Sequence, residues 1–406
     1  MMHISLSPNL EADDLRLAQA QLFNLSSWSQ HLFQDQLTQQ LAKLFPNAKA
    51  IYLFNSGRSA LMIALKTLNL KPKTPILLQS FTCSAVPNAI LWNGLQPEYL
   101  DIGGDFNLDS KTLPQTTQAK ALILQHTFGL PGEIDQIKNY CQKHSLFLIE
   151  DCAHSLGAAY NNQPIGSFGD MAILSFGRDK VISSVFGGAL IVNNPQLVNC
   201  SNQLYSAIPT PGFWWTTQQL LHPLITNFVK NHYSLFGKAF LSLSQKLKLI
   251  SKAIYPLERA HLTPPIFPGK LPEPLAKLAL NQLNKLSRFN NHRQQIAFYY
   301  QQNLTNPAIQ KPDYSKNSIY LRYTITLSQP ENLRQYLIKH QIILDKNPWY
   351  RQPVTPSNNL FRAGYSSGSC PTAERICQTC LNLPTNPLTS FKDAQFIVKL
   401  INQWSS

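Results

Sequence analysis

The segment IEDCAHSLGAAYNNQPIGSFGDMAILSFGRDK, residues 149–180, sets an aspartate and a lysine directly behind two short apolar runs. Asp151 follows the run 146–150, and Lys180 follows the run 171–176. Such runs are typical of strands buried on both faces, and open α/β sheets bind ligands at the carboxyl ends of their strands. Taken singly, Asp151 also fits a helix N-cap and Lys180 a solvated lysine. A lysine serves as a Schiff-base amine when burial and nearby cations lower its pKa.

The pattern of this segment extends on both sides of it. The expected strands are 49–55, 75–79, 121–127, 146–150, 171–176 and 189–192, and the expected helices between them are 59–70, 85–93 and 133–144. Strands that alternate with helices predict an α/β fold with a largely parallel sheet covered on both faces. A long helix over 274–304, a strand over 318–327 and helices over 331–340 and 392–404 predict a smaller C-terminal α+β domain.

Composition limits the partners of the chain without choosing among them. The 406 residues carry 35 Lys+Arg against 21 Asp+Glu, a net charge of +14. This sign favours phosphorylated small molecules, nucleic acid or an anionic membrane face. Seven scattered cysteines do not resemble a disulfide framework, and we see neither a secretory signal nor a transmembrane run. We therefore expect a cytoplasmic protein.

A second candidate site element lies between the first strand and the first helix. Asn55-Ser56-Gly57-Arg58-Ser59 combines a turn-forming glycine, helix N-terminal N–H groups and a cation. Such a helix start binds anions such as phosphate. An ordinary helix cap explains the same residues when they are taken alone.

Several motifs, in their order and spacing, together resemble one known family. They are NSGRSAL (55–61), DIGGDFNLD (101–109), QHTFGLPGEIDQI (125–137), the segment 149–180 with its continuation to Leu190, and CPTAERICQTCLNLPTNPLT (370–389). The match resembles the DegT/DnrJ/StrS-type family of PLP-dependent sugar aminotransferases, where PLP is pyridoxal 5′-phosphate. It runs from about Asn55 to Val192 and resumes loosely from Ala276 to Trp404.

The resemblance implies PLP fold type I, the aspartate-aminotransferase-like fold. This fold has a large α/β/α domain with a mainly parallel sheet and a smaller C-terminal α+β domain. We expect a large PLP-binding domain over 1–205, a basic aromatic insertion over 206–268, and a linking helix with the small domain over 269–406. A homodimer with active sites near the subunit interface is also implied. The N-x-R-M motif by which a partner subunit often reaches the phosphate has no clear counterpart here.

The resemblance also assigns catalytic roles to three residues. Lys180 would hold PLP through its amine and shuttle a proton. Asp151 would keep the pyridine nitrogen protonated, which preserves the ring as an electron sink. His154 would bond the cofactor's 3-oxygen or stack beside the ring. A lysine at position 180 favours amino transfer over the family's sugar dehydratase branch.

The remaining cofactor contacts implied by the resemblance concern the phosphate and the ring face. The phosphate would lie on the backbone of Gly57, Arg58 and Ser59, with the hydroxyls of Ser175 and Ser183. Cys83 stands where many relatives have an aromatic residue stacked on the ring.

The insertion (206–268) admits two interpretations. No Asp or Glu occurs between Lys180 and Leu257, and lysines there are interleaved with Phe and Trp. The segment could lie on an anionic membrane surface as a peripheral contact at its inner face. The plainer alternative is helices packed over the large domain or the dimer interface, with their lysines in solvent.

The expected reaction moves an amino group from an amino acid, glutamate by preference, to a nucleotide-activated keto-sugar in polysaccharide or secondary-metabolite biosynthesis. The rivals are a PLP-dependent sugar dehydratase and a catalytically silent membrane-surface regulator on the same fold. We expect no nucleic-acid partner, because net charge alone points to one and no recognisable reading motif accompanies it. We also expect no metal, because Cys370, Cys377 and Cys380 lack the further ligands of a zinc site. His126 fits the pocket wall and the protein core equally well.

Overall fold

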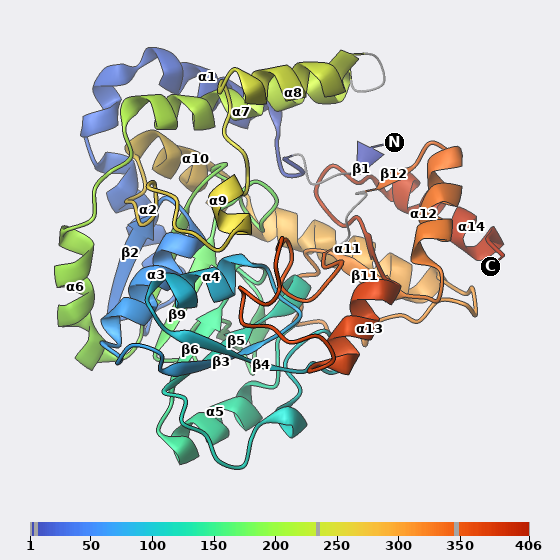
Figure 1. Ribbon diagram of the computed structural model, residues 1–406. Coiled ribbons are helices and arrows are strands. Elements are labelled where there is room, and N and C mark those ends of the chain that lie inside the picture. The colour runs from blue at the N-terminus through green and yellow to red at the C-terminus, as the bar shows by residue number, and fades with distance from the viewer. Residues whose placement is uncertain (1, 4–6, 233–235, 345–348, 406) are drawn as a thin grey trace.

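A computed structural model describes residues 2–3, 7–232, 236–344 and 349–405 of the chain (Figure 1). A seven-stranded sheet forms its centre, in the order β2-β10-β9-β6-β5-β3-β4. These strands are β2 (Ala50–Phe54), β3 (Pro75–Gln79), β4 (Gln96–Leu100), β5 (Ala121–Gln125), β6 (Phe147–Asp151), β9 (Met171–Ser175) and β10 (Gly188–Val192). All neighbours pair in parallel except β10, which runs antiparallel to β2 and β9. The predicted mainly parallel sheet is confirmed.

Helices flank this sheet above and below in the view of Figure 1. The first half contains α1 (Ala12–Phe23), α2 (Leu32–Leu44), α3 (Gly57–Thr67), α4 (Ala85–Trp92), α5 (Ile134–His144) and α6 (Val198–Ser206). The second half contains α7 (Phe213–Asn231), α8 (Lys238–Lys246), α9 (Pro256–Arg259), α10 (Glu273–Leu283), α11 (Leu286–Asn303), α12 (Pro330–Lys339), α13 (Pro371–Thr379) and α14 (Phe391–Gln403). Three short pairings complete the fold: β1 (Met2–His3) with β12 (Ile343–Leu344), β7 (Ala159–Tyr160) with β8 (Gln163–Pro164), and β11 (Tyr323–Thr326) with β13 (Cys380–Leu383).

The central strands form because their sequences are short apolar runs that can be buried on both faces. Every residue of β5 and of β10 is buried. The edge strand β4 was not predicted, since its sequence QPEYL carries a proline and an exposed glutamate. An edge position tolerates both residues, because one side of the strand needs no ladder hydrogen bonds.

Two predictions for the C-terminal part are wrong in detail. The helix expected over 274–304 is two helices, α10 and α11, interrupted at Asn284 and Lys285. The Lys285 ammonium meets carboxylates of Glu11, Asp13 and Asp14 at this break, a contact with the chain's other end that a helical pattern does not reveal. The strand expected over 318–327 is shorter, Tyr323–Thr326, because residues before it bond to the backbone of Phe128 and Gly129 instead.

The C-terminal elements pack onto one edge of the sheet. Their hydrophobic core includes Phe81, Phe106 and Phe128, which lie in loops that follow strand ends of the first half. This packing carries the loop around Trp349 and Tyr350 to the carboxyl ends of the strands. Among the described residues, no helix is both long enough and apolar enough to cross a bilayer.

Candidate active site

A cavity of about 830 Å³ opens at the carboxyl ends of the parallel strands. It lies where an open α/β sheet places its ligand. Seven of the nine residues predicted for the site line it: Gly57, Arg58, Cys83, Asp151, His154, Ser175 and Lys180. Four elements contribute them, because β2, β3, β6 and β9 all end at this edge of the sheet.

Lys180 and His154 contact each other inside this cavity. Lys180 Nζ lies 3.0 Å from His154 Nε2, and the backbone N–H of Phe128 donates to His154 Nδ1 at 3.3 Å. Burial lowers the pKa of His154 well below its usual value, helped by the charges of Lys180 and Arg322, so the imidazole is neutral. With Nδ1 accepting, the ring proton sits on Nε2 and points at the lysine nitrogen. This contact positions the Lys180 amine, the group that would attack an aldehyde.

Asp151 is the last residue of β6 and is 5 % exposed. Its Oδ1 accepts a hydrogen bond from the N–H of Ala153 at 3.0 Å. Burial raises the pKa of the Asp151 carboxyl, while the Ala153 hydrogen bond and the positive charge of Lys180 act in the opposite direction. A carboxylate in this setting is stabilised by a cationic partner in the cavity.

The start of α3 forms one wall of the cavity. Ser56 caps the helix by accepting the N–H of Ser59 at 3.1 Å, and Ser175 lies against Gly57. At the adjacent position 188 only glycine fits, because a Cβ there would lie 2.6 Å from the nitrogen of Gly57. The first N–H groups of a helix have no partner within the helix, so this wall offers donors to an anion.

The structure does not bring two predicted phosphate ligands, Ser59 and Ser183, to the cavity. The backbone N–H of Ser59, the donor expected for the phosphate, donates instead to Ser56 Oγ at 3.1 Å, and the Ser59 hydroxyl donates to Asn55 Oδ1 at 2.6 Å. The Ser183 hydroxyl accepts the N–H of Val185 at 3.1 Å. Neither residue is among those that line the cavity. The Ser59 N–H and the Ser183 hydroxyl are therefore both engaged within their local turns.

Arg58 lines the cavity, and its guanidinium is already neutralised. It forms an ion pair with Glu258 of α9 and donates to the carbonyl of Ala253 at 3.1 Å. Both partners belong to the insertion (206–268), so the insertion meets the large domain beside the α3 wall. The sequence signal for Arg58 pointed to an anion, whereas its described partner is a carboxylate of the chain itself.

Several lining residues were not assigned from sequence. Trp349 stacks on the His154 ring at 4.8 Å between centroids, and Lys180 Nζ lies 4.5 Å from the Trp349 ring centroid. Tyr350 lies beside Trp349 in the same wall. Arg178, two residues before Lys180, also faces the cavity. The position of Arg178 in the loop directly after β9 could have indicated from sequence that it lies at the site. Trp349 gave no such indication, because its loop reaches the site only through long-range packing.

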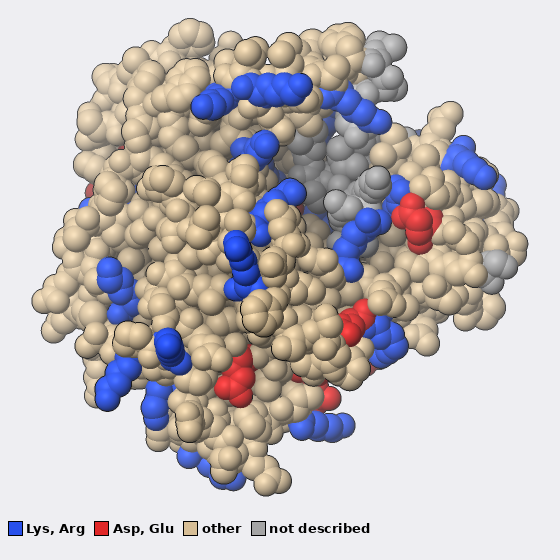
Figure 2. All heavy atoms as spheres, viewed as in Figure 1, with Lys and Arg blue, Asp and Glu red and all other residues tan. Residues whose placement is uncertain are grey.

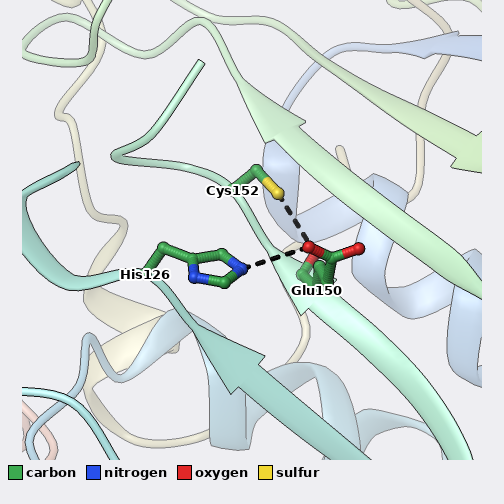
Figure 3. A group of neighbouring side chains, drawn as sticks. All are labelled: His126, Glu150 and Cys152. Carbon is green, nitrogen blue, oxygen red and sulfur yellow. Dashed lines mark hydrogen bonds and ion pairs between the residues drawn. The ribbon is translucent and has the colours of Figure 1, made fainter. Parts of the chain in front are cut away.

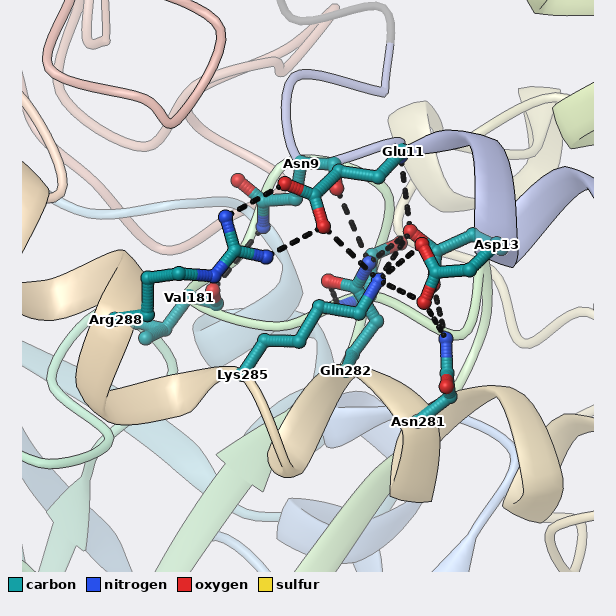
Figure 4. A network of polar contacts seen from close by, with 10 residues as sticks. Asn9, Glu11, Asp13, Val181, Asn281, Gln282, Lys285 and Arg288 are labelled. Atoms are coloured by element: carbon teal, nitrogen blue, oxygen red, sulfur yellow. Dashed lines mark hydrogen bonds and ion pairs between the residues drawn. The ribbon is translucent and has the colours of Figure 1, made fainter.

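The loop that carries Lys180 is fixed from behind by the N-terminal segment (Figure 4). The Asn9 amide donates to the carbonyl of Lys180 at 2.7 Å and to that of Val181 at 3.1 Å. The buried Arg293 of α11 donates both to Asn9 Oδ1, at 3.0 Å, and to the same Val181 carbonyl, at 2.8 Å. The side chains of Glu11 and Asp13 bind Lys285 beside it. The backbone at Lys180 and Val181 is therefore held by Asn9, near the N-terminus, and by Arg293 of α11.

His126 takes the second of its two predicted positions, in the core. Its Nε2 lies 3.2 Å from Glu150, close to Cys152 (Figure 3). The Glu150 carboxylate also accepts backbone N–H groups of Gly166, Phe168 and Gly169, at 2.7 to 2.9 Å. His126 Nδ1 accepts the N–H of Gly132 at 3.1 Å. Through these hydrogen bonds Glu150 and His126 fix the loop 166–169 and its neighbours. The cluster of His126, Glu150 and Cys152 therefore has a structural role.

The three C-terminal cysteines are buried in and beside one helix. Cys370 precedes α13, Cys377 lies within it and Cys380 begins β13. The two groups of metal-ligand side chains found among the described residues are His126 with Glu150 and Cys152, and Glu11 with Asp13 and Asp14.

The residues present fit PLP. The amine of Lys180 and the carboxyl of Asp151 line one cavity, the α3 wall offers N–H donors, and the buried Nε of Arg178 has no hydrogen-bond partner among the described residues. An amine for the aldehyde, an acid for the pyridine nitrogen and donors for the phosphate meet the three demands of this cofactor. This combination, on a mainly parallel sheet, defines a fold-type-I PLP enzyme.

Comparison with known proteins places the chain more narrowly. The model of the DegT/DnrJ/EryC1/StrS aminotransferase family matches residues 11–209 and 258–402, and the chain belongs to this family. It is therefore a PLP-dependent aminotransferase. The family resemblance and the enzyme class predicted from the motifs are confirmed.

Individual relatives share low sequence identity with this chain over most of their length. The chain is 24% identical over 340 residues to the UDP-N-acetyl-3-dehydro-alpha-D-glucosamine 3-aminotransferase of Acidithiobacillus ferrooxidans, covering 82% of this chain and 78% of the relative. It is 26% identical over 365 residues to the dTDP-4-dehydro-2,3,6-trideoxy-D-glucose 4-aminotransferase of Saccharopolyspora spinosa, covering 85% and 81%.

A solved structure supports the predicted fold type. Helicobacter pylori PseC, an aminotransferase involved in the biosynthesis of pseudoaminic acid, superimposes with a TM-score of 0.76 at 20% identity, covering 99% of this chain and 98% of that chain. This similarity confirms fold type I.

Proposed function

We propose that the chain transfers an amino group from an amino acid, with glutamate as the expected donor, to a nucleotide-activated keto-sugar. The observation that carries this proposal is the placement of Lys180 and Asp151 on one cavity at the carboxyl ends of β9 and β6. Relatives named for UDP- and dTDP-sugars support the substrate class. We place the reaction in polysaccharide or secondary-metabolite biosynthesis.

In this proposal each side chain has a defined task. Bound PLP supplies an aldehyde and an electron-accepting ring. Lys180 holds the cofactor through its amine and then moves a proton between the substrate carbon and the cofactor. Asp151 keeps a proton on the pyridine nitrogen. His154, held neutral by burial, positions the Lys180 amine through the 3.0 Å contact. The Trp349 ring stacks on His154 and lies beside the Lys180 amine.

The reaction is testable by absorbance. Glutamate added to the PLP-loaded protein should bleach the visible absorbance of the bound cofactor, and a keto-sugar nucleotide should restore it. The variant Lys180→Ala should lack both that absorbance and transfer, whereas the matched control Lys138→Ala, an exposed residue of α5, should keep both. A wild-type protein that shows no visible absorbance after PLP is added would refute the proposal.

We further propose that residues 1–205 form the large PLP-binding domain and that 269–406 form the linking helix and small domain. The insertion (206–268) then lies between them. Supporting this division, the family model passes over residues 210–257. We also propose a homodimer, as the family resemblance implies, in the cytoplasm, where a reducing environment would keep all seven cysteines as free thiols.

The insertion is proposed to contact an anionic membrane surface peripherally. It exposes large apolar side chains, among them Phe213 at 58% and Leu247 at 59%, beside the exposed Lys246 and Lys248. Basic side chains lie along the upper edge of the face in Figure 2, where α7 and α8 run. Apolar side chains flanked by lysines fit the boundary between headgroups and acyl chains.

A further inference from the structure

The charges that line the cavity are unequally compensated. Five basic side chains face it (Arg58, Arg178, Lys180, Lys252 and Arg259) against three acidic ones (Asp151, Asp179 and Glu258). Arg58 has its counter-ion in Glu258. Arg178 forms no ion pair with any described residue, although Asp179 adds some favourable charge nearby. Burial lowers the pKa of Arg178 to about 10, so it stays cationic at neutral pH.

The guanidinium of Arg178 is held firmly in spite of this missing partner. Its Nη2 donates to the carbonyl of Ser251 at 2.8 Å and to the Ser251 hydroxyl at 2.9 Å. That hydroxyl donates in turn to Gln219 of α7 at 2.8 Å. Arg178 also lies over the ring of Phe186, 5.5 Å from its centroid. The insertion thus fixes an arginine that belongs to the Lys180 loop.

Fixing a cation beside a cavity without a counter-ion has an energetic cost, since a desolvated charge needs a partner. The Nε of Arg178 is buried and has no hydrogen-bond partner among the described residues. A guanidinium offers several N–H donors in a fixed plane, a geometry that matches phosphoryl oxygens. The same Phe186 ring also contacts Arg58, the second residue of α3, at 5.5 Å, so Arg178 lies close to the proposed phosphate wall.

We propose that Arg178 is a phosphate-binding residue of the cavity, and that Ser251 and Gln219 of the insertion are the residues that position it. This inference rests on the proposed function, because the phosphoryl group belongs either to PLP or to the diphosphate of the nucleotide-activated sugar. In both cases the anion is bound by a residue of the same chain. The chain lacks a recognisable N-x-R-M motif for a ligand from the partner subunit, and Arg178 supplies a cation in its place.

Binding of four probes to the full-length chain tests the inference: PLP, pyridoxal (which lacks the phosphate), UDP and dTDP. Arg178→Gln removes the charge, Arg178→Lys keeps it without the planar donors, and Ser251→Ala removes one positioning contact. Arg375→Gln, an exposed residue of α13 outside the cavity lining, controls for net charge. Thermal unfolding and circular dichroism check that each variant is folded.

A charge-assisted hydrogen bond contributes enough that its loss should weaken binding by about tenfold or more. If the cofactor phosphate is the ligand, Arg178→Gln weakens PLP by that factor and leaves pyridoxal unchanged. If the substrate diphosphate is the ligand, the same variant weakens UDP and dTDP and leaves PLP unchanged. Arg178→Lys and Ser251→Ala should give smaller losses with the same probe selectivity.

Two results would overturn the inference. One is that Arg178→Gln binds all four probes like the wild type. The other is that it loses PLP and pyridoxal equally, since this marks a purely structural role. In both results the wild-type protein still gives visible absorbance with PLP, which separates them from failure of the proposed function.

Discussion

The strand ends around Lys180 and the helices of the insertion differ in how their charged side chains are partnered. Around the strand ends, two buried charged groups are held by hydrogen bonds: Glu150 of β6 accepts three backbone N–H groups, and Arg293 of α11 donates to Asn9 and Val181. Arg178 differs from them, because its Nε has no partner among the described residues. In the insertion, no acid precedes Glu258, and lysines lie among exposed apolar side chains. Buried groups held by several hydrogen bonds keep one geometry, as catalysis requires. The insertion meets them at a few defined contacts, through Ser251, Ala253 and Glu258.

The largest effect that tests this contrast should come from Asp151→Asn at the strand ends. The amide cannot keep the pyridine nitrogen protonated, so the electron-accepting power of the ring falls. We expect kcat to drop by about 10²–10³-fold, the scale of losing a major electrostatic contact in an active site. PLP affinity should change far less, because the phosphate and Lys180 contacts remain. Steady-state kinetics and PLP titration measure both quantities.

The control for this variant is Glu98→Gln, which removes the same charge from an exposed position on the edge strand β4. It should leave both kcat and PLP affinity unchanged. If Asp151→Asn turns over at nearly the wild-type rate, the assigned role of the carboxyl is wrong.

The strand ends were predictable because their signals are local. Apolar runs fixed where β6 and β9 end to within a residue, and the chain itself then sets Asp151 and Lys180 at the same edge of the sheet. Glycines 57 and 188 belong to motifs read directly from the sequence. For these features, neighbouring residues carry the information.

Other site residues could not be predicted, because they depend on contacts distant in sequence. Trp349 reaches His154 through the C-terminal core, and Ser251, which bonds Gln219 of α7, lies more than 70 positions after its partner Arg178. The break between α10 and α11 coincides with the binding of Lys285 to acids near residue 11. A helical or alternating pattern contains no trace of such partners.

A smaller effect should appear when the exposed charges of the insertion are reversed. Each lysine near an anionic bilayer contributes about 1 kcal/mol, so Lys246→Glu with Lys248→Glu should reduce binding to vesicles containing phosphatidylserine by about tenfold or more. Co-sedimentation at low salt measures this, and higher salt should reduce wild-type binding as well. The matched control Lys71→Glu with Lys73→Glu, exposed elsewhere, should bind like the wild type. Equal, negligible pelleting of all three proteins would refute the membrane contact.

The smallest effect concerns Lys230, the one lysine of α7, whose ammonium donates to the carbonyl of Ser7 at 2.7 Å. Burial lowers its pKa to about 8. Below pH 8 both the folded and the unfolded chain carry this proton, so the folded state bears the full cost of the buried charge. Between about 8 and 10.4 the folded chain releases the proton while the unfolded chain keeps it, so stability rises with pH in that window.

Lys230→Met removes this titration while filling a similar volume, at the loss of one hydrogen bond. We expect the variant to be more stable than the wild type by about 1 kcal/mol at pH 7, with the difference shrinking as the pH approaches 10. Urea unfolding of both proteins at pH 7 and 9.5 measures the change. Lys246→Met, at an exposed position of α8, should show no such pH dependence. If the free energies of unfolding of Lys230→Met and the wild type differ by the same amount at both pH values, Lys230 keeps its proton in the folded chain. The charge of Lys230 would then be as well compensated as the hydrogen-bonded charges near the strand ends.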